Sequence, residues 1–511
     1  MPVKLNVPLP SGGLIVDRPG EFVDTRSATN SKNVDVNRNI IRKRPGTVAL
    51  GATLAEQIMR YFELQVGSTS RLFRVGITDI QDLTKATSTW NSVTASALTA
   101  TVDDHVSYAF PLLAGAKTAV YTNGVDAIRK VGITGDDADL GGTPPLARFV
   151  RAFGPYLVLG YITDGGTTYY SRVQWCDTGD PETWTGGNAG SVDLLEDSAD
   201  ITGLGLFGNF LTVHKRESIY IGQLVTTSDV FRFDRKPTGV GTVAEATIAN
   251  LPSGEQAFLA LDGIHLFNGT TAPLISAPIQ DELRETINPA AIHRSCGGYV
   301  EGLDEYWCAV PIGGSLTPNT IYKYNTITGK VYKDERPDMT TFSFYVNTTE
   351  DTWDSAVGIW DTETERWDSA AAQSLTKLIV FGDSAGLSTV KNLGAYADNG
   401  VAFASNFETK DFTAADFGVP DFDKIMRWKG IEIWGTGTGV ALDYSIDGGT
   451  TWVTVGTGTL TSNIGADSSP AEFYFDVVAS RIRFRFSNDE SNGTFSMTKY
   501  QIEATPREYR R

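Results

Sequence analysis

The sequence predicts an all-β chain, an irregular six- or seven-bladed β-propeller with a C-terminal β-sandwich. One strand-turn-strand pattern is written twice, at residues 209–222 and 256–269. The two copies lie about 47 residues apart, which is close to the length of one four-stranded propeller blade. Similar units recur from about residue 54 to residue 393, and a composition with 52 Gly, 25 Phe and 19 Tyr favours strands and turns.

Residues 1–51 are expected to form an N-terminal hairpin and assembly segment. Val34 and Val36 alternate with polar residues, and a return strand follows a turn at residues 37–39. This return strand carries the densest basic cluster of the sequence, including Arg42, Lys43 and Arg44. The cluster either protects a solvated hairpin edge or contacts an acidic neighbouring subunit or a nucleic acid. Because the segment is too short for a core of its own, we predict that these three residues form a subunit interface.

The propeller is expected over residues 52–395. One apolar landmark residue marks each strand-turn unit, and the spacings of about 37 to 61 residues indicate irregular blades with loop insertions. The landmarks are Phe73, Tyr121, Val158, Ile219, Leu266, Tyr322 and Val380. A single helix is predicted at residues 279–287, because acidic residues follow Pro278 and the run stops before Pro289.

A tryptophan-rich insertion interrupts the last part of the propeller. Trp353, Trp360 and Trp367 recur every seven residues, and each is followed by Asp. The flanking Thr, Asp and Gly residues favour an extended or looped segment over a helix. Three Trp side chains carry much apolar area, so they must pack on their own blade or on another subunit. We include them among the predicted interface residues.

A composition change marks the C-terminal part of the chain. Residues 396–420 are expected to be a linker, and residues 421–511 a small β-sandwich. The evidence for the sandwich is strong alternation of apolar and polar residues from 424 to 505.

Composition also limits the possible functions. The net charge of −18 makes the chain a poor candidate for tight binding of nucleic acid, and it is also what a solvated, self-repelling surface would have. No segment approaches the roughly 20 apolar residues that cross a bilayer, and the first residues do not resemble a secretory signal. The three cysteines form no CxxC pair and fit a reducing compartment.

No motif in the sequence predicts catalysis. The segment 445–452 resembles an Asp-box, in which Ser and Asp side chains bond to the turn backbone. Ser384 lies in a Gly-Xaa-Ser-Xaa-Gly pattern, but no histidine follows it, so we interpret the pattern as a blade turn. The four histidines are far apart and have no metal-ligand spacing. We therefore expect no catalytic residue, no cofactor and no bound metal.

Six local patterns occur in order over residues 30–370: the hairpin at 33–46, the unit at 173–184, Lys215-Arg-Glu-Ser-Ile-Tyr, the segment 261–276, Tyr322-Lys-Tyr-Asn325 and the Trp-Asp insertion. Together they resemble the tail nozzle proteins of short-tailed bacteriophages. This family is also called tail tubular protein B or tail stabilisation (hub) proteins.

The resemblance implies a propeller subunit of the virion tail, assembled in the bacterial cytoplasm into a ring that is usually hexameric. Such a ring lies below the portal and adaptor, extends the DNA ejection channel and anchors fibres or spikes. DNA passes through it without specific binding, and no membrane insertion is implied. Two alternatives stay open, a glycan-binding receptor-recognition protein of propeller type and a glycosidase.

The acidic charge gives an expectation for a DNA channel. Lysines or arginines on its wall would hold phosphates, whereas acidic groups repel the duplex within about 8–10 Å at physiological salt. Asp164, Asp262 and Asp383 each lie at a blade turn beside Gly. We predict that these three residues line the channel.

Overall fold

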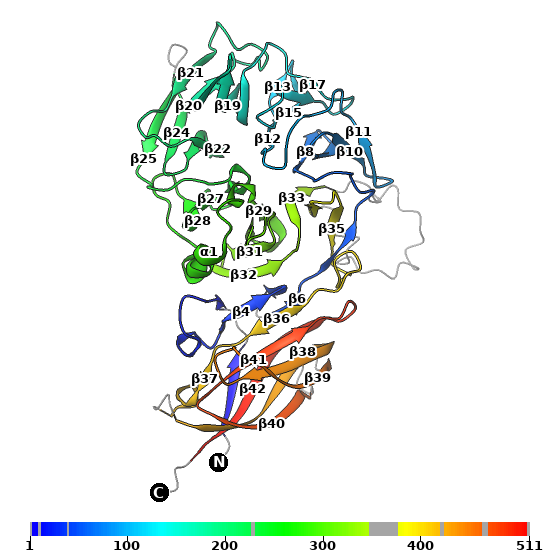
Figure 1. The fold of residues 1–511 in the computed structure, drawn as a ribbon, viewed down its shortest axis with the longest axis vertical. Helices are drawn as coiled ribbons and strands as arrows, with labels where there is room; N and C mark the ends of the chain where they lie inside the picture. Colours follow the sequence, from blue (N-terminus) through cyan, green and yellow to red (C-terminus); the bar gives the residue numbers. More distant parts are fainter. Residues whose placement is uncertain are drawn as a thin grey trace.

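The computed structural model describes residues 3–8, 12–37, 40–225, 230–346, 377–419, 424–461 and 469–507. These residues form two all-β bodies arranged end to end along the long axis, a propeller and a C-terminal domain (Figure 1). No helix among them is both long enough and apolar enough to cross a membrane.

Within the described ranges, seven sheets form the blades of the propeller, which confirms the predicted fold class and gives seven as the blade number. The first strands of successive blades contact one another around the axis at six of the seven blade junctions of the described residues, so these strands are the innermost strands of their blades. From the innermost strand outward, the blades are β8 (Arg60–Val66), β9 (Thr69–Val75), β10 (Ile80–Thr84), β11 (Thr89–Ser92); β12 (Ser107–Ala109), β15 (Ala119–Thr122), β16 (Arg129–Val131), β17 (Ala138–Asp139); β18 (Leu146–Phe153), β19 (Tyr156–Asp164), β20 (Thr167–Trp175), β21 (Gly190–Asp193); β22 (Ile201–Phe207), β23 (Phe210–Lys215), β24 (Ile219–Leu224), β25 (Phe231–Lys236); β26 (Ala249–Asn250), β27 (Gln256–Ala260), β28 (Gly263–Phe267); β29 (Cys296–Val300), β30 (Glu305–Val310), β31 (Thr320–Asn325), β32 (Lys330–Glu335); and β33 (Met339–Tyr345), β34 (Leu378–Asp383), β35 (Ser388–Asn392), β7 (Gly46–Ala49).

The two copies of the hairpin pattern are equivalent parts of neighbouring blades. Residues 209–222 form β23 and β24 of the fourth blade, and residues 256–269 form β27 and β28 of the fifth. In the second copy the turn requires Gly263, because its φ is +145° and a Cβ there would lie 2.4 Å from Ser276 Oγ. The segment 273–275 takes the fourth position of the fifth blade through backbone hydrogen bonds to β28.

The propeller is closed by a strand from the N-terminal segment. β7 pairs antiparallel with β35 and becomes the outermost strand of the seventh blade. Beyond the end of β7, the Leu50 amide donates to the Ser388 carbonyl at 2.8 Å. Residues 1–51 are therefore not a separate segment as expected, because their last strand belongs to the propeller.

The rest of the N-terminal segment belongs to the C-terminal domain. β1 (Val3–Pro8) pairs with β42, β4 (Asn30–Lys32) pairs with β36, and the hairpin of β5 (Val34–Asn37) and β6 (Ile40–Lys43) pairs through β6 with β42. β36 lies in the expected linker 396–420, which is therefore part of the sheet. The other strands of this domain are β37 (Phe412–Thr413), β38 (Met426–Ser445), β39 (Val453–Thr461), β40 (Ala471–Ala479), β41 (Arg481–Asn488) and β42 (Phe495–Pro506).

The C-terminal domain has two packed layers that share β38. The first half of β38 pairs with β40 and β42, and its second half pairs with β39 and β41. The layers meet through aromatic rings, since Phe475 of β40 packs against Tyr444 of β38 and Phe484 of β41. This is the sandwich-like domain that the alternating sequence predicts.

The predicted helix is present as α1 (Gln280–Thr286), where Leu283 is buried together with the preceding Ile279. The other strands of the described residues form two short pairs, β2 (Gly13–Leu14) with β3 (Ser27–Ala28) and β13 (Leu112–Leu113) with β14 (Ala116–Lys117). Single 3₁₀ turns are η1 (Gly20–Phe22), η2 (Glu245–Thr247), η3 (Ala277–Ile279), η4 (Ile292–Arg294), η5 (Glu301–Leu303) and η7 (Ala414–Phe417).

Buried ion pairs join the two bodies. Lys323 of β31 contacts Asp35 of β5 at 2.7 Å and Asp334 of β32 at 2.9 Å, and its side chain is 1% exposed. Arg44, which lies between β6 and β7, pairs with the partly exposed Asp398 at 2.6 Å and donates to the Glu335 carbonyl of β32 at 3.3 Å. One apolar core also continues from the fifth and sixth blades into the C-terminal domain. The two bodies are therefore held by charge and by apolar packing together.

Candidate functional site

The loops that precede the first strand of each blade lie at one end of the propeller. Because the strands of a blade alternate in direction, the loops leading into the first strands and the turns between second and third strands share this end. A cavity of about 40 Å³ opens there. Its lining comes from the loops before β8, β12 and β29 and from the start of β33, and includes Arg60, Asp103, His105, His293, Arg294, Ser295 and Thr341.

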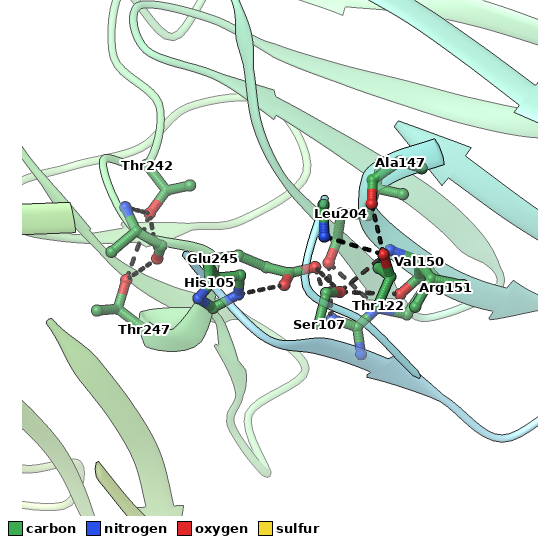
Figure 2. Close-up of polar contacts among 12 residues, drawn as sticks. His105, Ser107, Thr122, Ala147, Val150, Arg151, Leu204, Thr242, Glu245 and Thr247 are labelled. Carbon is green, nitrogen blue, oxygen red and sulfur yellow. Dashed lines mark hydrogen bonds and ion pairs between the residues drawn. The ribbon is translucent and has the colours of Figure 1, made fainter. Parts of the chain in front are cut away.

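Glu245 is the centre of a polar network beside this cavity (Figure 2). Its carboxylate contacts His105 Nε2 at 2.8 Å and accepts hydrogen bonds from Ser107 Oγ at 3.0 Å and Arg151 Nη2 at 3.4 Å. Arg151 also donates to the Leu204 carbonyl at 2.8 Å. These residues lie on or beside β12, β18 and β22. Glu245 bonds directly to the second and third blades, and Arg151 extends the network to the fourth.

The charge of Glu245 is favoured by its partners. Burial alone would raise the pKa of this carboxyl, but the hydrogen bond from His105 and the charge of Arg151 outweigh burial and hold the pKa below its usual value. Glu245 is therefore a buried anion that is satisfied by its neighbours.

The structure brings His105 and His293 to the same cavity, although they are far apart in the sequence. His293 Nε2 lies 3.6 Å from Asp103 Oδ1, and the adjacent Arg294 donates to the same oxygen at 2.5 Å. Burial and the charge of Arg294 lower the pKa of His293. No spacing motif signals this grouping, because each residue lies in a different loop before an innermost strand.

A second cavity of about 190 Å³ shares Arg60 with the first. Arg60, Arg151 and Glu245 line it together with Gly297 and Gly298 of β29, and Tyr108 and β33 residues complete the wall. Two arginines and one glutamate give its lining an excess of positive charge, in contrast to the acidic chain as a whole.

Two of the three basic residues predicted at a subunit interface are buried within the chain. Lys43 is 1% exposed and donates to Asn488 Oδ1 at 2.9 Å, and burial followed by the charge of Arg44 lowers its pKa to about 8. Arg44 is 2% exposed and bonds to Asn33 and Asp398. The prediction is corrected for these two residues, because buried side chains present no surface to a neighbouring subunit. Arg42 is exposed and stays a candidate.

Arg42 and Lys43 also line a groove of about 850 Å³ between the propeller and the C-terminal domain. Apolar residues of the seventh blade and of β42 form the rest of its wall, among them Phe344, Leu378 and Phe495. The predicted interface tryptophans Trp353, Trp360 and Trp367 lie outside the described residues.

The three aspartates predicted to line a channel all occupy turns between the second and third strands of their blades. Asp164 ends β19, Asp262 precedes β28 and Asp383 ends β34, so they share the end of the propeller where the cavity opens. Asp262 contacts His265 Nε2 at 2.9 Å, and burial raises the pKa of Asp383. None of these aspartates lines the cavity of about 40 Å³ or the cavity of about 190 Å³, which we call the two axial cavities. Their place in a channel formed by several subunits stays a prediction.

The two sequence motifs that resemble those of enzymes, the Gly-Xaa-Ser-Xaa-Gly pattern and the Asp-box, form hydrogen bonds with groups that lie beside them in the fold. Ser384 donates to Asp338 Oδ1 at 2.6 Å, and no histidine among the described residues bonds to it. In the Asp-box, Ser445 donates to Asp447 Oδ1 at 2.7 Å and Asp447 accepts from the Thr451 amide at 2.9 Å. Over the described part of the chain, no group of three or more His, Cys, Asp or Glu side chains is placed to hold a metal ion.

The remaining buried histidine gives a pH prediction. Burial lowers the pKa of His214 to about 4, against 6.5 for an exposed histidine. Because the folded pKa is the lower one, the free energy of unfolding should fall by about 3 kcal/mol as the pH decreases from 6.5 to 4, and level off below. Urea unfolding of wild type and His214→Gln at several pH values measures this. The variant should lack this component, and parallel pH curves for the two proteins would contradict the assignment.

The chain matches no protein-family model, and no curated protein matches it. Among solved structures it is similar to BBS1N in complex with ARL6DN, with 10% identity and a TM-score of 0.41 over 70% of this chain and 99% of that one. It is also similar to BamB from Moraxella catarrhalis, with 8% identity and a TM-score of 0.37 over 67% and 99% of the two chains. The WD40 domain of Toxoplasma gondii coronin matches with 8% identity and a TM-score of 0.34 over 71% and 88%.

Proposed function

We propose that the chain is a structural protein of a short-tailed phage virion, the subunit of a tail nozzle or hub ring that extends the DNA ejection channel and anchors fibres or spikes. The proposal rests on the ordered sequence patterns over residues 30–370. The firm connection between the propeller and the C-terminal domain also supports it, because a ring subunit that anchors fibres needs its two domains in a fixed arrangement.

The structural feature that best supports the proposal is the path of the N-terminal segment. Its strands pair with the C-terminal sheet through β6 and with the propeller through β7. Between them, Arg44 donates to Asp398 Oδ2 at 2.6 Å and to the Glu335 carbonyl at 3.3 Å. A hinge would need small, weakly packed contacts at this point. The segment instead couples both bodies, as a rigid ring subunit requires.

The experiment is to locate the protein in particles. Quantitative mass spectrometry of purified virions that encode this chain should find it in the mature particle, in a fixed ratio of about six copies to one portal ring. Its absence from particles would contradict the proposal. Specific binding in a glycan array by the purified chain, without incorporation into particles, would favour the receptor-recognition alternative.

A single charge reversal tests the exposed part of the predicted interface. Arg42→Glu should leave the chain folded, because this side chain is exposed, and should weaken association with an acidic neighbour at least several-fold. Lys117→Glu, an exposed change on the second blade, is the matched control. Sedimentation of both variants measures the assembly, and equal assembly by Arg42→Glu and wild type would exclude Arg42 from the interface.

A further inference from the structure

Three polar atoms at the axial cavity of about 40 Å³ have no hydrogen-bond partner within the described part of the chain. They are Arg294 Nε, Ser295 Oγ and Thr341 Oγ1. Ser295 is 0% exposed and Thr341 is 1% exposed, and all three residues line the cavity. Buried polar groups in folded proteins are almost always hydrogen-bonded. Three such atoms around one cavity indicate that ordered water or a polar ligand occupies it.

The lining has two arginines and two aspartates, so the groups without a partner specify the kind of ligand. Arg60 lines both axial cavities and forms no ion pair with a carboxylate of the described residues; its guanidinium lies 5.6 Å from the Tyr108 ring centroid. An arginine on the axis of a chain with 61 acidic and 43 basic residues would readily find an acidic partner on the surface. Here the positive charge of Arg60 lies at the wall of both cavities without a carboxylate partner among the described residues.

The nearby acidic groups are already engaged. Asp103 accepts from Arg294 Nη2 at 2.5 Å, and Asp104 accepts from the Thr101 amide at 2.7 Å. Glu245 is held by His105, Ser107 and Arg151 (Figure 2). The groups without partners are therefore donors: two from arginines and two hydroxyls that can also donate.

We propose that the axial cavity binds one small oxyanion, a phosphate, sulfate or carboxylate group, held by Arg60, Arg294 Nε and the hydroxyls of Ser295 and Thr341. A space of this volume holds a group of a few heavy atoms, since about 10–15 Å³ is needed for one water. Charge-assisted bonds from arginine suit an oxyanion better than a neutral ligand. A carboxylate comes either from a free acid in solution or from an acidic side chain of another chain, and both sources share this chemistry.

Calorimetric titration of the full chain with sodium phosphate, sodium sulfate and sodium acetate, against sodium chloride at equal ionic strength, tests the site. We expect one saturable site per chain for at least one oxyanion and no saturable heat with chloride. Arg60→Gln should weaken binding roughly 10-fold or more, because it removes a charge-assisted contact. Arg232→Gln, on the exposed face of β25, is the matched control and should bind like wild type.

A double variant that should fold normally tests the site separately from any effect of Arg60→Gln on folding. Ser295→Ala with Thr341→Val removes two unpartnered hydroxyls, so the chain should fold and still bind more weakly than wild type. Equal affinity in wild type and both cavity variants would overturn the site. So would an absence of saturable binding by all three oxyanions, or a crystal structure grown in phosphate with only ordered water in the cavity. Acetate binding without phosphate or sulfate binding would assign the site to a carboxylate. These results do not depend on whether the chain forms a ring.

Discussion

Replacement of Lys323 by methionine should lower the free energy of unfolding by about 3–5 kcal/mol, because it leaves two buried carboxylates without their cation. Lys323 Nζ lies 2.7 Å from Asp35 Oδ1 and 2.9 Å from Asp334 Oδ1. The Asp334 side chain is 3% exposed and that of Asp35 is 11% exposed. Burial alone would raise the pKa of Asp35, but the charge of Lys323 outweighs it and the net pKa is lowered.

Lys377→Met is the matched control for this change. Its partner Glu301 is 67% exposed and Lys377 itself is 51% exposed, so the pair should contribute at most about 1 kcal/mol. Chemical unfolding of both variants provides the comparison. A loss below about 1 kcal/mol for Lys323→Met would mean that the buried pairs do not hold the N-terminal segment between the two bodies.

A disulfide between positions 49 and 389 should stabilise the chain by about 3–5 kcal/mol, because it closes a loop of about 340 residues at the joint of the propeller. Ala49 of β7 pairs directly with Thr389 of β35. The adjacent Leu50–Ser388 hydrogen bond makes 49 and 389 a non-hydrogen-bonded pair, with Cα atoms about 4.5 Å apart, which suits a disulfide. Native cysteines should not interfere, since Cys176, Cys296 and Cys308 are buried.

The double variant Ala49→Cys with Thr389→Cys should cross-link fully under mild oxidation and show a raised unfolding midpoint that reductant reverses. Ala49→Cys with Asn392→Cys is the displaced control, because Asn392 pairs with Gly46 instead. Three residues of offset in a strand correspond to about 10 Å, beyond the reach of a disulfide. Equal cross-linking of both pairs, or none in the first, would contradict closure of the propeller by β7.

The local part of the fold could be predicted from the sequence. Alternation and Asp-Gly or Asn-Gly turns depend on neighbouring residues, and the hairpins at 209–222 and 256–269 form as expected. The pairing of β7 with β35 could not be predicted, because the pattern of residues 46–49 does not indicate that the partner strand lies at residues 389–392. The sequence of a short strand does not specify which sheet edge it pairs with when several edges could accept it.

The basic cluster shows a second limit. A run of Arg42, Lys43 and Arg44 looks like an exposed surface, since such residues are rarely buried without a partner. Their partners Asp398 and Asn488 are hundreds of residues away, so the sequence gives no sign that two of the three are buried. The axial cavity was missed for the same reason, because Arg60, His105 and His293 meet only when the blades close.

The mass and symmetry of the purified full chain test the central claim most directly. Light scattering together with electron-microscope class averages should show a closed ring, for a hexamer six copies of the 55.3 kDa chain or about 330 kDa in all, with a central opening. Arg42→Glu should shift this population toward the monomer. A chain that stays a 55.3 kDa monomer at all concentrations, in the presence of the neighbouring tail components as well, would contradict the ring subunit.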